Sequence, residues 1–106
     1  MDESRDFYMK IHHYGGQLTL AACDREILGK KLKQGKVTVV INPGFYGGDL
    51  VEGSTVLDML GKVSNANLFG NRIVELASNA GWVDPGGIMI IEDIKHVQIY
   101  DVREKG

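Results

Sequence analysis

Residues 7–23 read FYMKIHHYGGQLTLAAC, two runs of alternating side chains on either side of a glycine pair. Glycine supplies the positive φ that a two-residue hairpin turn requires, so this stretch predicts a β-hairpin with strands at 7–14 and 17–23. Pairing Tyr14 with Gln17 gives one apolar face, made of Phe7, Met9, Ile11, Leu18, Leu20 and Ala22. The other face is predicted to be the wetter one and carries Tyr8, Lys10, His12, Tyr14, Gln17, Thr19, Ala21 and Cys23.

Helical patterns follow the hairpin at three places. Residues 24–28 predict one helical turn that Asp24 caps and Gly29 ends. A helix is predicted at about 54–63, with Thr55 and Asp58 resembling a capping box. A second helix is predicted from Asn67, as its N-cap, to residue 80, with Gly81 in a left-handed C-terminal cap.

The remaining segments predict strands and turns. The β-branched run at 37–41 is typical of a buried strand, and NPGFYGG at 42–48 predicts a loop. Residues 88–91 and 97–102 predict two strands after a turn at 84–87. The order β-β-β-α-α-β-β predicts the α+β class, with a mostly antiparallel sheet and two helices packed on one face. We expect one domain over 1–106, with 1–6 as a disordered N-terminal extension.

Composition excludes several classes of protein. The chain has 106 residues, a net charge of −2 and one cysteine. A slightly acidic protein does not coat nucleic acid non-specifically, and a lone cysteine cannot form an internal disulfide. No apolar run approaches the ~20 residues of a membrane span, so a cytoplasmic protein without membrane contact is expected.

The candidate catalytic residues lack any established spacing. His12 and His13 are neighbours in a strand and point to opposite faces, so neither a metal site nor a cofactor is predicted. Cys23 could act as a nucleophile with His96 as its base, but no thiol-enzyme motif surrounds it. A lone cysteine in such a domain is usually a small apolar filler.

Two features are typical of nucleic-acid binding. Phe45 and Tyr46 are adjacent aromatics in a glycine loop, so one of them could remain exposed as a stacking or docking anchor. Lysines 30, 31, 33 and 36 could form a basic, aromatic strip with the wetter hairpin face, although lysines at a strand edge often serve solubility alone.

The chain resembles a family of short archaeal proteins catalogued as domain-of-unknown-function family 424. The resemblance runs from about residue 10 to 100 and rests on Ala22-Cys23-Asp24, Leu28-Gly29, Phe45-Tyr46-Gly47-Gly48, Ala66-Asn67-Leu68-Phe69-Gly70, Ala77, Gly81 and His96-Val97-Gln98. It implies an archaeal, cytoplasmic source and gene neighbours that act in translation, notably an initiation-factor subunit. Shared loop and polar positions more often mark binding than packing.

The leading hypothesis is a small non-catalytic binding module in translation or RNA metabolism. Its expected partners are RNA, the ribosome or an initiation factor, and a homodimer is a further prediction. The alternative is a small-ligand protein or enzyme with a cleft made by His96, Asp24 and Cys23. Ten residues are predicted to form the binding surface: Lys10, His12, Asp24, Phe45, Tyr46, Gly47, Gly48, Asn67, His96 and Gln98.

Overall fold

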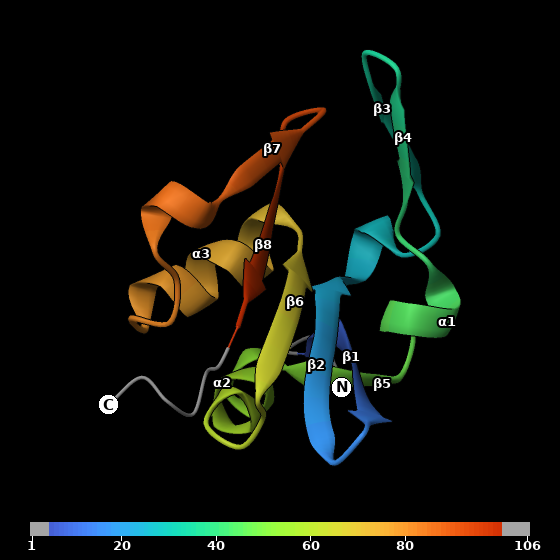
Figure 1. Ribbon diagram of the computed structural model, residues 1–106. Coiled ribbons are helices and arrows are strands. Elements are labelled where there is room, and N and C mark those ends of the chain that lie inside the picture. The colour runs from blue at the N-terminus through green and yellow to red at the C-terminus, as the bar shows by residue number, and fades with distance from the viewer. Residues whose placement is uncertain (1–4, 101–106) are drawn as a thin grey trace.

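The computed structural model describes residues 5–100. It contains a six-stranded sheet, in the order β5-β1-β2-β6-β8-β7, and a two-stranded ribbon of β3 and β4 (Figure 1). The strands are β1 (Arg5–Tyr14), β2 (Gln17–Asp24), β3 (Lys31–Gln34), β4 (Val37–Val40), β5 (Asp49–Glu52), β6 (Asn65–Phe69), β7 (Met89–Ile91) and β8 (Ile94–Ile99). The helices are α1 (Pro43–Tyr46), α2 (Gly53–Leu60) and α3 (Asn71–Asn79), with 3-10 turns η1 (Arg25–Ile27) and η2 (Pro85–Gly87).

The sheet is antiparallel throughout except for the pair β2 and β6, which is parallel. The predicted α+β class with a mostly antiparallel sheet is confirmed. The hairpin is confirmed in register as well, because Tyr14 pairs with Gln17, and the turn glycines have φ values of 54° and 84°.

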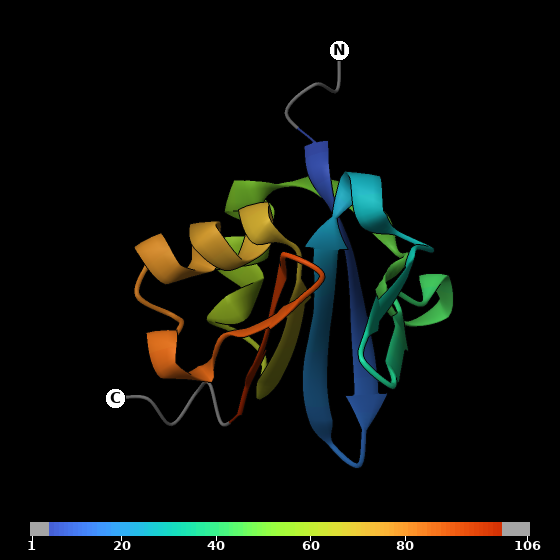
Figure 2. The ribbon, with the colours of Figure 1, turned by 90° about the horizontal axis from the view of Figure 1, so that it is seen from above.

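The first face of the sheet carries the larger core. α2 and α3 lie on this side, as Figure 2 shows, while the ribbon and α1 lie on the other. Two helices on one face are therefore confirmed. The apolar hairpin side chains pack here as predicted, among the buried residues Phe7, Leu20, Ala22, Val56, Leu60, Val63, Ala66, Leu68, Ile73, Val74, Ala77, Val83, Val97 and Ile99.

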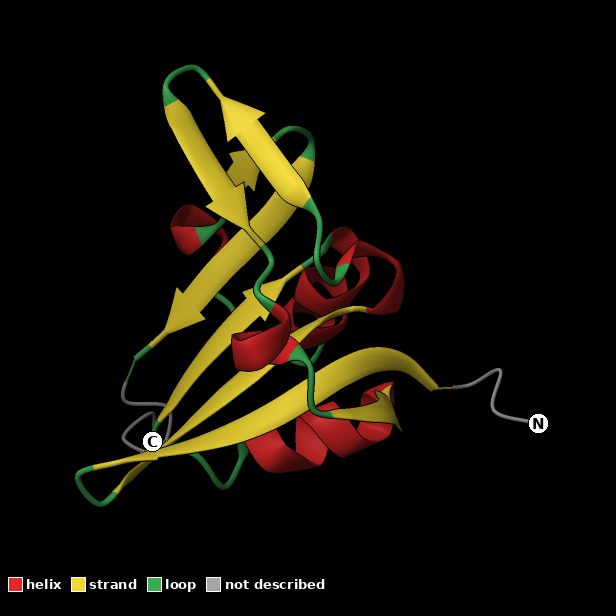
Figure 3. Cartoon of the chain, turned by 90° about the vertical axis from the view of Figure 1, so that its right-hand side faces the viewer, coloured by secondary structure: helices red, strands yellow, loops and turns green. Residues whose placement is uncertain are grey.

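Elements that follow β2 cover part of the second face of the sheet. The prediction that this whole face is the wetter one is therefore wrong. After β2 the chain returns over this face as η1, the ribbon and α1 (Figure 3). Ala21 and Cys23 are fully buried beneath these elements, in a second core with Ile27, Leu32, Ile41, Tyr46, Phe69 and Ile91. The ribbon tip is fastened to the turn between β7 and β8, where Gln34 Nε2 donates to Ile90 O at 3.2 Å and the Lys33 amide donates to the Glu92 carboxylate.

The helix predicted from Asn67 is wrong in its first third. Asn65–Phe69 is strand β6, and α3 begins only at Asn71. Ala66 and Leu68 point into the first core while Asn67 lies on the second face, and this two-residue alternation places β6 between β2 and β8. Asn67 is therefore not an N-cap. The predicted C-terminal end is confirmed, because Gly81 has φ 86° and the Trp82 amide donates to Ala77 O.

Smaller predictions also need correction. Residues 37–40 are not a buried strand, because the ribbon stands out from the sheet and only Val39 of β4 is partly covered. The predicted loop holds the short helix α1, since Pro43 suits its first turn and the Asn42 side chain accepts the Gly44 amide. α2 has no side-chain cap, so the Thr55–Asp58 capping box does not form. Strands β3 and β5 were not predicted.

The predicted chain ends fall partly outside the described range. Of the expected extension, Arg5 and Asp6 are the first residues of β1, and 1–4 lie outside the described residues. The last predicted strand begins earlier, at Ile94, and its final residues 101 and 102 also lie outside. Within residues 5–100, no helix has the length and apolar character that crossing a membrane requires.

Candidate functional site

Asp24, one of the ten residues predicted to form the binding surface, is buried and has a structural role. Its side chain is 2% exposed. The sequence predicts that Asp24 caps the turn at 24–28, but the side chain makes no capping hydrogen bond to η1. It caps α3 instead: the carboxylate accepts the amide of Arg72 at 3.0 Å and that of Ile73 at 2.8 Å. Burial raises the pKa of this carboxyl, and the two amide hydrogen bonds oppose the rise. Gly70 leaves room for it, because a Cβ there would lie 2.3 Å from Asp24 Cγ.

Cys23 is a packing residue in this structure. Its side chain is fully buried in the second core, so the accessibility expected from the sequence is wrong. Burial, together with the negative charges of Asp24 and Glu26, raises the pKa of the thiol to about 12. A thiol with such a pKa is protonated at neutral pH and is a poor nucleophile.

Three further predicted residues meet in one hydrogen-bond network. Asn67 Oδ1 accepts the Tyr46 hydroxyl at 2.9 Å and lies 2.8 Å from His96 Nε2. His96 stacks on Phe69 with ring centroids 4.5 Å apart, and burial lowers the pKa of its imidazole. The neutral imidazole with its proton on Nε2 satisfies this contact, because an amide oxygen can only accept. The network fixes α1 on the sheet.

Gly47 and Gly48 are needed for close packing. A Cβ on Gly48 would lie 2.1 Å from Met9 O, and one on Gly47 would lie 2.5 Å from Pro43 O. The chain leaves α1 here and passes directly against β1. The two glycines therefore place the α1 loop against β1.

Two of the predicted residues, His12 and Phe45, form a stack of rings with Tyr14 on the second face. His12 stacks between Phe45, at 4.7 Å between centroids, and Tyr14, at 5.8 Å, with interplanar angles of 15° and 6°. His12 Nε2 lies 2.8 Å from Phe45 O, and Lys10 Nζ donates to Gly44 O at 2.9 Å. Tyr14, at the outer end, is 58% exposed. These contacts hold the rings parallel.

Polar side chains continue from this stack across the sheet. The register places His12 beside Thr19 and Thr19 beside Asn65, and in the next row Lys10 and Ala21 lead to Asn67 and Gln98. Tyr100 joins the same face, because its hydroxyl donates to Gln98 Oε1 at 2.7 Å. We call this uncovered part of the second face the platform; it comprises Lys10, His12, Tyr14, Gln17, Thr19, Phe45, Asn65, Gln98 and Tyr100.

The lysines of the ribbon and the ring stack do not form the single basic, aromatic strip that the sequence predicts. The ribbon stands at the end of the sheet away from the β1–β2 turn (Figure 1), and its tip is bonded to the β7–β8 turn. Charge is nevertheless divided along the chain. Residues 8–48 contain six lysines and arginines against two acidic residues, whereas residues 49–100 contain three against seven. Lys10 is the cation nearest to the ring stack along β1.

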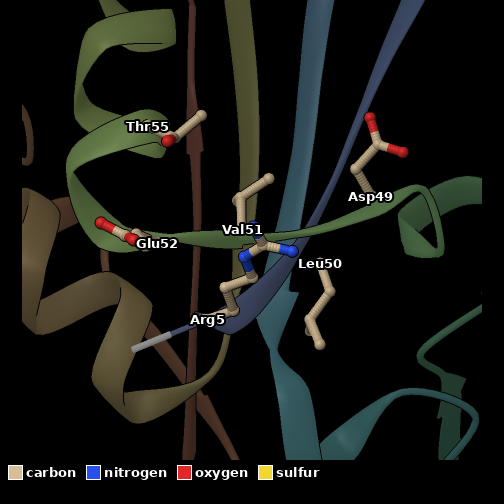
Figure 4. A pocket seen from close by; sticks show the side chains of 6 residues that line it. All are labelled: Arg5, Asp49, Leu50, Val51, Glu52 and Thr55. Carbon is tan, nitrogen blue, oxygen red and sulfur yellow. The ribbon is translucent and has the colours of Figure 1, made fainter. Parts of the chain in front are cut away.

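Among the pockets lined by residues 5–100 are two at opposite edges of the sheet. The larger, about 570 Å³, runs along edge strand β5 and is lined by Arg5, Asp49, Leu50, Val51, Glu52 and Thr55 (Figure 4). It contains none of the ten residues predicted to form the binding surface. The smaller, about 160 Å³, lies beside β8 and includes Gln98 of the platform. No group of three or more histidine, cysteine, aspartate or glutamate side chains suited to a metal ion occurs within residues 5–100.

Comparison with known proteins places the chain in a family. Residues 12–102 match the family described as "Protein of unknown function (DUF424)", which is most of the chain. The chain belongs to the DUF424 family. A crystal structure titled "Crystal structure of an uncharacterized conserved protein from Methanopyrus kandleri" is similar to this DUF424 chain, with a TM-score of 0.77 and 24% sequence identity over 94% of this chain and 95% of that one. At that identity the likeness concerns the fold alone. No curated protein matches the sequence.

Sequence reasoning missed several residues of this DUF424 fold that matter to the site. Five platform residues are not among the ten predicted from the sequence: Tyr14, Gln17, Thr19, Asn65 and Tyr100. The alternation of Asn65, Ala66, Asn67 and Leu68 was the signal for β6, and with β6 in place Asn65 falls on the platform. Trp82 lies beside β8 because the chain turns back after α3, and no local pattern indicates that neighbour.

Proposed function

We propose that this DUF424 protein is a small, non-catalytic module that binds single-stranded RNA on the platform. The observation that carries the proposal is the parallel stack of Phe45, His12 and Tyr14, which ends in a ring that is 58% exposed. Unpaired bases stack on such rings, and every base has a π-face to offer.

The platform supplies groups for the rest of a nucleotide. Gln17, Thr19, Asn65 and Gln98 carry amides or a hydroxyl, which can hydrogen-bond to base edges and to the 2′-hydroxyl of ribose. From β1 to β8 the face spans three strand spacings, about 14 Å at roughly 4.8 Å each. Sheet platforms of this kind stack two or three bases.

Charge supports an anionic ligand on this side of the molecule. The platform strands β1 and β2 belong to the basic part of the chain, and Lys10 borders the ring stack. A few phosphate contacts give an affinity that falls with salt, by a slope of about −0.7 per contact for single strands. The proposal therefore includes a modest but measurable salt dependence.

A catalytic cleft of His96, Asp24 and Cys23 has less support. Asp24 caps α3, Cys23 is fully buried with a raised pKa, and His96 is bonded to Asn67. These contacts use the groups that acid-base or thiol chemistry would require. The gene neighbourhood that the family resemblance implies makes the ribosome, or an initiation factor on it, the first place to look for the RNA.

The test is the affinity of fluorescently labelled single-stranded RNA octamers, measured by anisotropy at several salt concentrations. Tyr14→Ser is expected to weaken binding about 5- to 150-fold, since stacking contributes about 1–3 kcal/mol per base. The matched control is His13→Ala, because His13 neighbours the stack on β1 but is exposed on the opposite face. Both variants should melt within a few degrees of the natural chain.

Three results would contradict the proposal. One is the absence of octamer binding at low salt, and another is an equal loss in Tyr14→Ser and His13→Ala. The third is an affinity that does not change with salt. Ribonuclease treatment of a pull-down from the host then separates RNA-bridged partners from proteins that dock directly.

A further inference from the structure

The small pocket beside β8 is built differently from the platform that it adjoins. Its volume is about 160 Å³, below the roughly 300 Å³ at which pockets for drug-sized ligands begin. It is lined by Trp82, Asp84, Gly87, Val97, Gln98, Ile99 and Tyr100. Two aromatic residues, one carboxylate and a strand backbone therefore meet in a space suited to one small planar group.

The strand that lines this pocket has an open edge. β8 pairs with β6 through Ile99, but its pairing with β7 stops at His96. Among the described residues, no strand pairs with Val97–Ile99 on the β7 side. The loop before β7 passes here instead, with Gly87 facing Val97, and backbone N–H and C=O groups at such an edge can bond to a ligand.

Asp84 adds a hydrogen-bond acceptor to the pocket. Its Oδ1 accepts the Gly86 amide at 3.1 Å, which fixes the side chain at the start of η2. A carboxylate has about four lone-pair positions on two oxygens, so this one bond leaves most of its accepting capacity available. A ligand that fits must present N–H donors and not acceptors.

We propose that this pocket binds a guanine base of the RNA strand that lies on the platform. Guanine presents two adjacent donors, N1–H and the N2 amino group, which match the two oxygens of a carboxylate. Adenine and cytosine have a ring-nitrogen acceptor beside their amino group, and uracil has a carbonyl on each side of its N–H. Each of these bases would therefore place an acceptor lone pair next to an oxygen of Asp84, which is repulsive. Trp82, which packs against the first core, and Tyr100, at the border of the platform, both line the pocket and carry aromatic rings.

The pocket continues the platform. Gln98 and Tyr100 belong to both, and they are bonded to each other at the end of the platform away from the ring stack. A strand that crosses from Tyr14 toward β8 reaches the pocket with its next base. The inference rests on the proposed function, and it adds a base preference to a surface that stacks any base.

The first experiment compares RNA octamers by anisotropy. Oligouridine is measured against the same octamer with one guanosine placed at each position in turn, and against inosine, which lacks the N2 amino group. Guanosine at the favoured position is expected to bind about tenfold more tightly than uridine, with inosine in between. Asp84→Asn keeps an acceptor for the Gly86 amide but turns a donor toward guanine, so it should remove the preference. Asp58→Asn, at an exposed position on α2, should keep it.

The outcomes separate this inference from the proposed function. Octamers that bind with equal affinity at every composition overturn the guanine pocket and leave the platform intact. A preference that survives Asp84→Asn also overturns it. Tyr14→Ser should weaken all octamers alike and retain the guanosine preference.

A second measurement examines the pocket without the platform. The chain has one tryptophan, so its fluorescence reports on Trp82 alone. Guanosine monophosphate should quench it more than adenosine monophosphate, after correction with free N-acetyltryptophanamide, and Asp84→Asn should abolish the difference. If no octamer binds, this titration decides the pocket alone: equal quenching by the two nucleotides refutes it, and selective quenching upholds it.

Discussion

Replacing Asp24 should destabilise the protein because its side chain joins the end of β2 to the first turn of α3. Asp24→Ala removes two hydrogen bonds from a carboxylate to the amides of Arg72 and Ile73 and leaves both donors without their partner. Hydrogen bonds to charged groups contribute about 1.5–3 kcal/mol each, and loss of an N-cap costs about 0.5–2 kcal/mol. Burying the charged carboxylate costs free energy, which is why burial raises the Asp24 pKa. The Ala variant avoids this cost, so part of the lost stability is recovered. We expect a net loss of about 2–4 kcal/mol in the free energy of unfolding.

The assay is urea unfolding followed by circular dichroism, with melting as a second measurement. A loss of this size lowers Tm by more than about 10 °C in a chain near 100 residues. Asp24→Asn keeps one acceptor oxygen and should lose about half as much. Asp58→Ala, exposed on α2, is the control and should stay within about 0.5 kcal/mol. An Asp24→Ala variant as stable as the control, or an Asn variant as unstable as the Ala variant, would refute the capping argument.

Three further predictions concern the packing of the site. Gly48→Ala should destabilise the chain by more than about 2 kcal/mol, since its Cβ would lie 2.1 Å from backbone Met9 O; a urea midpoint equal to that of the natural chain would exclude this close approach. Because burial lowers the pKa of His96 below its unfolded value of 6.5, its contribution to stability is complete above pH 6.5 and is lost as pH falls through the folded pKa. The urea midpoint should therefore drop more between pH 7.5 and 5.5 in the natural chain than in His96→Gln, and equal drops would contradict it. Cys23, with a pKa near 12 and no exposed surface, should react with a thiol reagent at pH 8 only as urea unfolds the chain, which absorbance of the released chromophore measures.

The parts of the fold that the sequence predicts are those with a local cause. The Gly15-Gly16 turn and the alternation around it give the hairpin in its observed register, and Gly81 marks the end of α3. β6 is missed because Phe69 and Ile73 are four residues apart, the spacing of a helix face, although Phe69 packs in the second core and Ile73 in the first. Pairing with β2 decides between strand and helix there, and that pairing joins residues far apart in sequence.

In the candidate site too, the sequence indicates some residues, while others come together only through contacts between distant parts of the chain. Aromatic Phe45 and His12 could be selected as residue types, and the structure brings them into one stack. The residue type of Asp24 suggests a binding role, yet its two partners lie 48 and 49 residues later, and no local pattern shows that its carboxylate already accepts two hydrogen bonds. The pocket beside β8 depends on how the loop after α3 returns to the sheet, so Trp82 and Asp84 meet Tyr100 only in the folded chain.

The cap that Asp24 places on α3 has a consequence for the order of folding. α3 has nine residues, fewer than the ~12–15 that an isolated helix needs in water, and its first turn takes its acceptor from the end of β2. β6, which precedes it, pairs in parallel with the same strand. The hairpin can therefore form early from neighbouring residues, while the C-terminal half must wait for it. A fragment of residues 49–106 should remain unstructured alone, and the whole chain should fold slowly for its size, because its decisive contacts close long loops.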